Sequence, residues 1–234
     1  MSDPSYPHEA TASLPGLAFP PMRAMVLDEA RRRSLPVVED DDGRLTIRTA
    51  NGLFGLRGGP ARVAAMVAAM DPRALHMLKD AVVEQLALAL PAVAQNLRWS
   101  DGEAAGATPP TFQFVRVRSV EPVGSAFLRV RVVADDLSRF GDDAIHFRLV
   151  LPPEGVADVE WPSVGPNGAT VWPSGEKSLH RPAYTTRRLD RDARLLDFDV
   201  FIHAGGRTTE WARRATPQTI VGLTGPGGGG IPGA

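Results

Sequence analysis

The stretch Leu196-Asp197-Phe198-Asp199-Val200-Phe201-Ile202 alternates between apolar and acidic side chains, which is typical of a half-buried β-strand. The same two-residue period returns in 114–118 and 128–132, and further short strands are predicted over 146–151, 184–189 and 219–223. Six short strands with few helices favour a small antiparallel barrel over a parallel sheet. A barrel would also leave no exposed sheet edge.

The chain before these strands has a different pattern. Residues 1–21 are rich in proline and are predicted to be a disordered tail. Residues 22–99 predict a small α+β domain of unknown role, and 100–110 have the composition of a linker. We therefore expect an α+β N-terminal unit followed by a mainly-β, six-stranded antiparallel barrel over 111–234.

Besides a short helix over 22–34, two helices are predicted inside the N-terminal unit. The first opens at Pro60 and places Val63, Met66, Val67 and Met70 on one face. The second starts at Pro72, with Asp71 as its N-cap residue and leucines at steps of three and four. His76 in this helix is expected to lie on the surface or to face a partner.

Composition excludes several classes of function. The 234 residues carry a net charge of −1, so no charge excess steers the molecule to nucleic acid or to an anionic membrane. The absence of cysteine excludes disulfides, thiolate metal sites and iron–sulfur clusters, and it is compatible with a cytoplasmic location. Charged residues interrupt the apolar runs in 61–97, so no membrane span is expected.

A second kind of pattern lies in 180–190, where one aromatic ring, adjacent hydroxyls and several guanidinium groups follow each other closely. Tyr184 is suited to lie against a flat ring, and Thr185 to hydrogen-bond a heteroatom at its edge. Arg181, Arg187 or Arg188 could take phosphate oxygens in a fork. The alternative interpretation is a basic, exposed barrel strand with a buried tyrosine.

The segment 203–214 leads from a strand end through Gly205 and Gly206 into a short helix. Thr208 or Thr209 is predicted to cap this helix. The free N–H groups of a helix start after glycines can hold an anion such as a pyrophosphate. An ordinary strand-to-helix turn is the alternative. The later glycine run 225–230 lacks a following helix and does not qualify as a dinucleotide-binding fingerprint.

Taken in order, these pieces resemble the siderophore-interacting protein family of flavin reductases. The resemblance covers roughly 112–230, and it rests on the runs 135–140, 146–152, 184–188, 197–203, 208–212 and 225–228. It implies a flavin-reductase-like barrel that holds FAD. The cofactor-binding residues implied by it are Arg181, Tyr184, Thr185, Thr186, Arg187, His203, Gly205, Thr208, Thr209 and Trp211.

In this resemblance Tyr184 stacks on the flavin, the turn after His203 lines the pyrophosphate and adenosine, and Trp211 packs the helix. The chain departs from the family pattern at Pro182, where an arginine is usual two residues before the tyrosine, so Arg181 would have to substitute. Gly206-Arg207-Thr208-Thr209 also replaces the family's Gly-Pro-Ala-Ser. The nicotinamide-binding domain that usually follows, about a hundred residues long as is typical of a domain, is absent from the sequence.

The leading functional hypothesis is an FAD-dependent oxidoreductase that passes electrons from NAD(P)H to a ferric siderophore and releases Fe(II). The NAD(P)H domain would come from a partner or from a missing C-terminal segment. No protein residue is assigned a catalytic or metal-binding role. The alternatives are a flavin- or siderophore-binding module that needs a partner for reduction, and a degenerate barrel with neither ligand nor activity.

Overall fold

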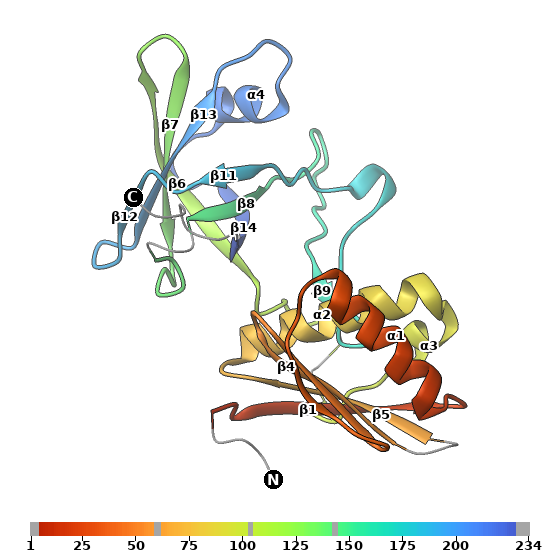
Figure 1. Ribbon diagram of the computed structural model, residues 1–234. Coiled ribbons are helices and arrows are strands. Elements are labelled where there is room, and N and C mark those ends of the chain that lie inside the picture. The colour runs from red at the N-terminus through yellow and green to blue at the C-terminus, as the bar shows by residue number, and fades with distance from the viewer. Residues whose placement is uncertain (1–4, 59–61, 103–104, 142–144, 228–234) are drawn as a thin grey trace. The chain divides into compact units, whose positions relative to one another are not determined.

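The computed structural model describes residues 5–58, 62–102, 105–141 and 145–227, which form two compact units. The first unit comprises residues up to Pro110 together with Pro162–Val171, and the second comprises Thr111–Trp161 and the residues from Trp172 onward. The chain therefore passes from the second unit into the first and back again within one long connection (Figure 1).

The first unit contains a five-stranded antiparallel sheet in the order β1-β5-β4-β3-β2. Every second residue of β1 and β5 is buried, which gives the sheet one apolar face, and helices pack against it (Figure 1). The strands are β1 His8–Pro15, β2 Val37–Asp40, β3 Arg44–Thr49, β4 Gly52–Gly58 and β5 Arg62–Ala69, and the helices are α1 Phe19–Arg32, α2 Pro72–Ala89 and α3 Pro91–Asn96.

Two predictions for this unit are wrong. Residues 1–21 are not a disordered tail in their described part, because β1 pairs with β5 over its whole length and buries Ala10, Ala12 and Leu14. The helix predicted after Pro60 is β5. Its buried residues alternate along the strand: Val63, Ala65, Val67 and Ala69. The larger apolar residues of this segment also fit one face of a helix, and the alanines did not reveal the two-residue period. Pro60 itself lies outside the described residues.

The second predicted helix is confirmed as α2. Asp71 is its N-cap residue, and its carboxylate accepts a hydrogen bond of 2.8 Å from the Ala74 N–H. His76 is not on the surface, however, because its side chain is only 1% exposed. A short hairpin of β9 (Ser163–Val164) and β10 (Thr170–Val171) covers it, and the Thr170 hydroxyl lies 2.8 Å from His76 Nε2. Neither strand of this hairpin is among those predicted from the sequence.

The second unit contains a seven-stranded antiparallel sheet in the order β11-β8-β14-β6-β7-β13-β12. One face encloses a core of Val, Leu and Phe side chains that includes Val130, Phe147, Leu196 and Phe198. The elements are β6 Phe112–Val123, β7 Phe127–Ala134, β8 His146–Val150, η1 Gly175–Lys177, β11 Ala183–Thr185, β12 Arg188–Asp190, β13 Leu195–Phe201, α4 Arg207–Arg214 and β14 Ile220–Gly227.

The predicted six-stranded closed barrel is not confirmed, because the described sheet has seven strands in a linear order. The predicted strand 184–189 is divided between β11, which pairs with β8, and β12, which pairs with β13. Between them, the Thr186 N–H donates to the Ile145 carbonyl over 2.8 Å and the Arg187 N–H to the Asp197 carbonyl over 2.7 Å. One continuous segment thus hydrogen-bonds to strands near both edges of the sheet.

None of the helices in the described part of the chain has the length and apolar character needed to cross a membrane. The glycine run 225–230 is described only as far as Gly227, where β14 ends, and residues 228–230 lie outside the described residues.

Candidate functional site

Tyr184 on β11 lies half-buried at the end of the second unit's core. Its ring centroid is 5.0 Å from that of Phe198 and 6.4 Å from that of Phe147, with tilted ring planes. Its side chain lies within interaction range of the Thr208 hydroxyl of α4. Burial raises the pKa of Tyr184, and the contact with Thr208 lowers it to a smaller extent. The hydroxyl is therefore protonated at neutral pH.

The two threonines after Tyr184 have different surroundings. Thr185 is exposed, and its hydroxyl lies 3.0 Å from Nδ1 of His146 on the neighbouring strand. The hydroxyl of Thr186 is buried and has no hydrogen-bond partner in the described structure. An unpaired buried hydroxyl is costly, and it marks a place where a ligand atom could complete the bonding.

Arg181 belongs to a small cationic group with Arg148 and Trp172. The Arg181 guanidinium lies 4.1 Å from the centroid of the Trp172 ring. Its backbone carbonyl accepts a 3.0 Å bond from Arg148 Nη1. Burial lowers the pKa of Arg181, and the nearby charge of Arg148 lowers it further. Neither arginine forms an ion pair with a carboxylate in the described residues, so both charges are available to an anion.

The strand-to-helix turn joins β13 to α4. Gly205 adopts a positive φ of 71°, which favours glycine, and Gly206 is the N-cap residue of α4. The predicted capping by Thr208 or Thr209 is wrong, because both lie inside the first helical turn and are buried. The Thr209 hydroxyl instead donates to the Phe201 carbonyl over 3.1 Å and accepts a 3.4 Å bond from the His203 N–H.

A pocket of about 470 Å³ lies beside this helix start. His180 lines it, and its Nε2 is 3.2 Å from the Thr208 hydroxyl. Burial lowers the pKa of His180, as does the charge of Arg207, so its imidazole is neutral at neutral pH. The lining consists of Leu151, Pro152, Pro153, Glu154, Gly155, His180, Gly205, Arg207, Glu210, Trp211 and Arg214.

Thr208 therefore links the two segments that the sequence singles out. Through its contacts with Tyr184 and His180, the tyrosine strand and the glycine-led helix start share one group of side chains. Trp211 lines the adjoining pocket and also packs against the core, while Gly205 belongs to the turn at its mouth.

Other predicted residues lie apart from this group. Arg187 is exposed. The pKa of Asp199 on β13 is lowered mainly by its hydrogen bond with Arg129, and the charge of Arg187 lowers it slightly further. His203 is exposed, and its ring stacks on Phe201 with centroids 6.4 Å apart. Thr185 contacts His146 on the outer face of the sheet.

Sequence reasoning assigned no role to Arg148, His146, Trp172 or His180. Arg148 and His146 pair with Ala183 and Thr185 across β8 and β11. This register could have been inferred from the alternation of the two strands. Trp172 follows the hairpin of a long connection, and no local pattern could have placed its ring under Arg181.

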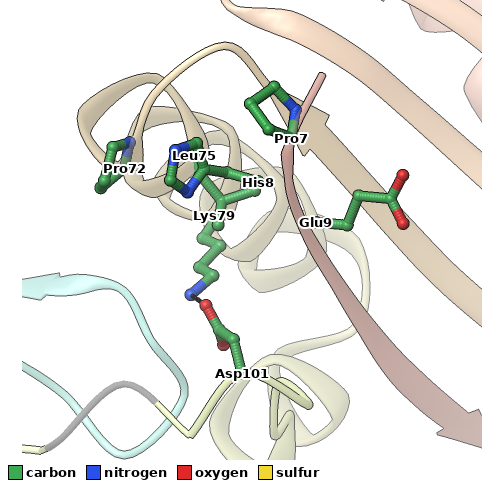
Figure 2. A pocket seen from close by; sticks show the side chains of 7 residues that line it. All are labelled: Pro7, His8, Glu9, Pro72, Leu75, Lys79 and Asp101. Atoms are coloured by element: carbon green, nitrogen blue, oxygen red, sulfur yellow. Dashed lines mark hydrogen bonds and ion pairs between the residues drawn. The ribbon is translucent and has the colours of Figure 1, made fainter. Parts of the chain in front are cut away.

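A separate pocket of about 330 Å³ belongs to the first unit (Figure 2). Lys79, one of its lining residues, is 1% exposed and forms an ion pair with Asp101, whereas the carboxylate of Glu9 points away from this pair (Figure 2). In the described residues, no group of three or more His, Asp or Glu side chains is arranged to hold a metal ion.

Residues 116–230 match the model of the siderophore-interacting FAD-binding domain. No curated protein matches the chain.

Among solved structures, a siderophore utilization protein from T. fusca is 25% identical, with a TM-score of 0.38, over 53% of this chain and 47% of that one. The siderophore-interacting protein SipS from Aeromonas hydrophila is 22% identical, with a TM-score of 0.40, over 50% of this chain and 43% of that one. The chain thus spans less than half the length of either structure. Through residues 116–230, it belongs to the family of siderophore-interacting FAD-binding domains.

Proposed function

We propose that the second unit binds FAD at the group formed by Tyr184, Thr208 and His180 and passes electrons through it to a ferric siderophore. The observation that carries this proposal is the contact of Thr208 with both Tyr184 and His180, which puts the tyrosine strand beside the helix start. One long cofactor could then reach both. When bound, FAD supplies the redox chemistry, accepting two electrons as a hydride from NAD(P)H and releasing them singly to Fe(III).

The residues present are suited to FAD. The buried, unpaired hydroxyl of Thr186 lies directly after β11, the strand expected to bind the flavin, and offers a hydrogen bond. Arg181 and Arg148 supply cationic charge without a carboxylate to neutralise it in the described residues, so Arg181 can replace the arginine expected at Pro182. The first-turn N–H groups of α4 have no acceptor within the helix and suit a pyrophosphate.

Each protein group has a separate task in this proposal. Tyr184 stays neutral and presents its ring and hydroxyl at the edge of the core. Thr185, which lies beside His146, hydrogen-bonds the ring edge. Arg181 binds phosphate oxygens, while Arg187, Thr209, His203, Gly205 and Trp211 line or support the nucleotide side. We also infer that the segment 183–190 closes the sheet into a six-stranded barrel, supported by its bonds toward β8 and β13.

The first test is a titration of the purified chain with FAD, followed by visible absorbance and flavin fluorescence. We expect saturable binding of one FAD and a yellow protein after gel filtration. Arg181→Gln should weaken FAD and FMN but leave riboflavin unchanged, because riboflavin has no phosphate. A chain that binds no flavin, or an Arg181→Gln variant that loses all three ligands equally, contradicts the site as described.

A second candidate function is a flavin-binding module that another protein reduces. It is supported by the family match over residues 116–230, which names FAD binding, the one property that such a module requires. Anaerobic bleaching of bound FAD by NADPH alone supports the self-sufficient reductase. Bleaching by dithionite but not by NADPH supports the module. In either case, transfer of electrons to a ferric hydroxamate or catecholate is measured by trapping Fe(II) with a coloured chelator.

A further inference from the structure

Two phenylalanines are exposed side by side at the ends of β7 and β13. Phe127 is 40% exposed and Phe201 is 57% exposed. They are direct partners in the β-ladder, and their ring centroids are 5.5 Å apart in an edge-to-face arrangement. The His203 ring stacks on Phe201, with ring centroids 6.4 Å apart and an interplanar angle of 27°. We call these three side chains the aromatic platform.

The platform interrupts an otherwise charged face of the sheet. The next two outward-facing pairs along the same strands are Arg129 with Asp199 and Arg131 with Asp197, each joined by two hydrogen bonds. In each pair the arginine and the aspartate form hydrogen bonds with each other, so neither side chain requires a ligand. The aromatic pair above them leaves apolar ring faces in water, and exposed apolar patches of this kind mark binding surfaces.

The platform is fixed to the start of α4. The Thr209 hydroxyl holds the Phe201 carbonyl and the His203 N–H, and the Ile202 N–H donates to the Ala126 carbonyl over 2.8 Å. The His203 ring also occupies the space beside Gly206, where a Cβ atom would lie 2.3 Å from it. The rings therefore sit next to the turn that leads into the helix, on preformed backbone.

We propose that the aromatic platform stacks the adenine ring of the bound FAD, with Phe201 as the main contact. This rests on the proposed function. FAD has a flat ring at each end, and the Tyr184 strand is assigned to only one of them. The family match spans both segments and names an FAD-binding domain, so adenine is the second ring that such a surface would meet. Phe127 supports Phe201 edge-on, and His203 flanks it.

The test compares FAD with FMN, because FMN carries the flavin and one phosphate but no adenine. In the full chain, Phe201→Leu keeps an apolar side chain and removes the aromatic face. Loss of one base-stacking contact is expected to weaken FAD binding by about 5- to 150-fold. FMN binding should change by less than about twofold, since the platform does not contact it in this proposal. Phe201→Trp keeps an aromatic face and should bind FAD about as tightly as the wild-type chain.

Phe114→Leu is the matched control, because Phe114 is an exposed phenylalanine of 43% exposure on the same sheet but on β6. It should leave both affinities unchanged. If the wild-type chain binds FAD and Phe201→Leu binds it equally well, the platform does not hold adenine and the inference is overturned while the FAD site stands. The same holds if Trp211→Leu, and not Phe201→Leu, selectively weakens FAD, because adenine then lies in the pocket beside α4. A wild-type chain that binds no flavin overturns the proposed function itself.

Discussion

The docking of the β9–β10 hairpin on α2 can be tested by a substitution at Thr170. Thr170 connects this hairpin to α2 through three hydrogen bonds. Its N–H donates to Asp80 Oδ1 over 2.6 Å, its hydroxyl donates to Asp80 Oδ2 over 2.9 Å, and the same hydroxyl lies 2.8 Å from His76 Nε2. Replacement by valine keeps the shape of the side chain and the N–H bond but removes both bonds of the hydroxyl.

The expected cost follows from the partners. A hydrogen bond to a charged carboxylate contributes about 1.5–3 kcal/mol, and a neutral bond about 1 kcal/mol. His76 is 1% exposed, but its Nε2 also lies 3.6 Å from Asp80 Oδ2, so part of the second loss can be recovered by a small movement. We therefore expect Thr170→Val to destabilise the docking of the hairpin on α2 by about 2–3 kcal/mol.

Amide hydrogen exchange followed by mass spectrometry measures this locally. Peptides that cover 163–171 and α2 should exchange about 30- to 140-fold faster in Thr170→Val, because each 1.4 kcal/mol is a factor of ten. Peptides from β6, β7 and β13 should be unchanged, which provides an internal control. Thr170→Ser keeps the hydroxyl and should exchange close to wild type. Equal protection in the valine and wild-type proteins would show that the hydroxyl does not fasten the hairpin.

The remaining predictions concern the second unit. Tyr184→Phe removes the hydroxyl that lies near Thr208 but keeps the ring, so it should weaken FAD binding less than Tyr184→Ala and should lower the free energy of unfolding in urea by no more than about 1 kcal/mol. Asp197 is 3% exposed and accepts two hydrogen bonds of 2.8 and 2.7 Å from Arg131. Asp197→Ala should lower the free energy of unfolding by about 2–4 kcal/mol, which is less than for a fully buried pair because the arginine is one-third exposed. Because the pKa of His180 is lowered in the folded state, the unfolded chain binds protons more readily below a pH of about 6.5, and stability decreases as the pH is lowered through this range. His180→Gln should therefore show a smaller decrease in melting temperature between pH 7 and pH 5 than the wild-type chain.

Strands and the capped helix α2 could be predicted from the sequence where a single local pattern was clear. Asp71 followed by Pro72 defined the start of α2, and each of the six strand segments predicted after 111 corresponds to one or two observed strands. The wrong helix prediction for β5 arose because its alanines do not distinguish buried from exposed positions. Ala65 and Ala69 are buried in β5, but alanine is equally common in helices, so Val63, Met66 and Val67 favoured the wrong period.

The candidate site was predictable as two segments, and their contact was not. The ring, hydroxyl and arginine chemistry of 180–187 is visible in the sequence. The contacts of Thr208 with Tyr184 and His180 depend on how α4 packs against the core, which is a tertiary property. The same reason explains the wrong expectation for His76. Its helical position did not reveal that a hairpin starting more than eighty residues later would cover it.

This hairpin has a consequence for how the two units are linked. The chain leaves the second unit after Trp161, contributes residues 162–171 to the first unit, and returns at Trp172, whose ring lies under Arg181. The connection is thus anchored at one end on α2 by Thr170 and on α3 by Asn167, and at the other end on β8 by the pairing of β11. A change that loosens the hairpin gives the connection before Trp172 more conformational freedom. Arg181 would then lose part of its preorganisation toward a phosphate, and its cation–π contact with Trp172 is the first interaction in the second unit expected to weaken.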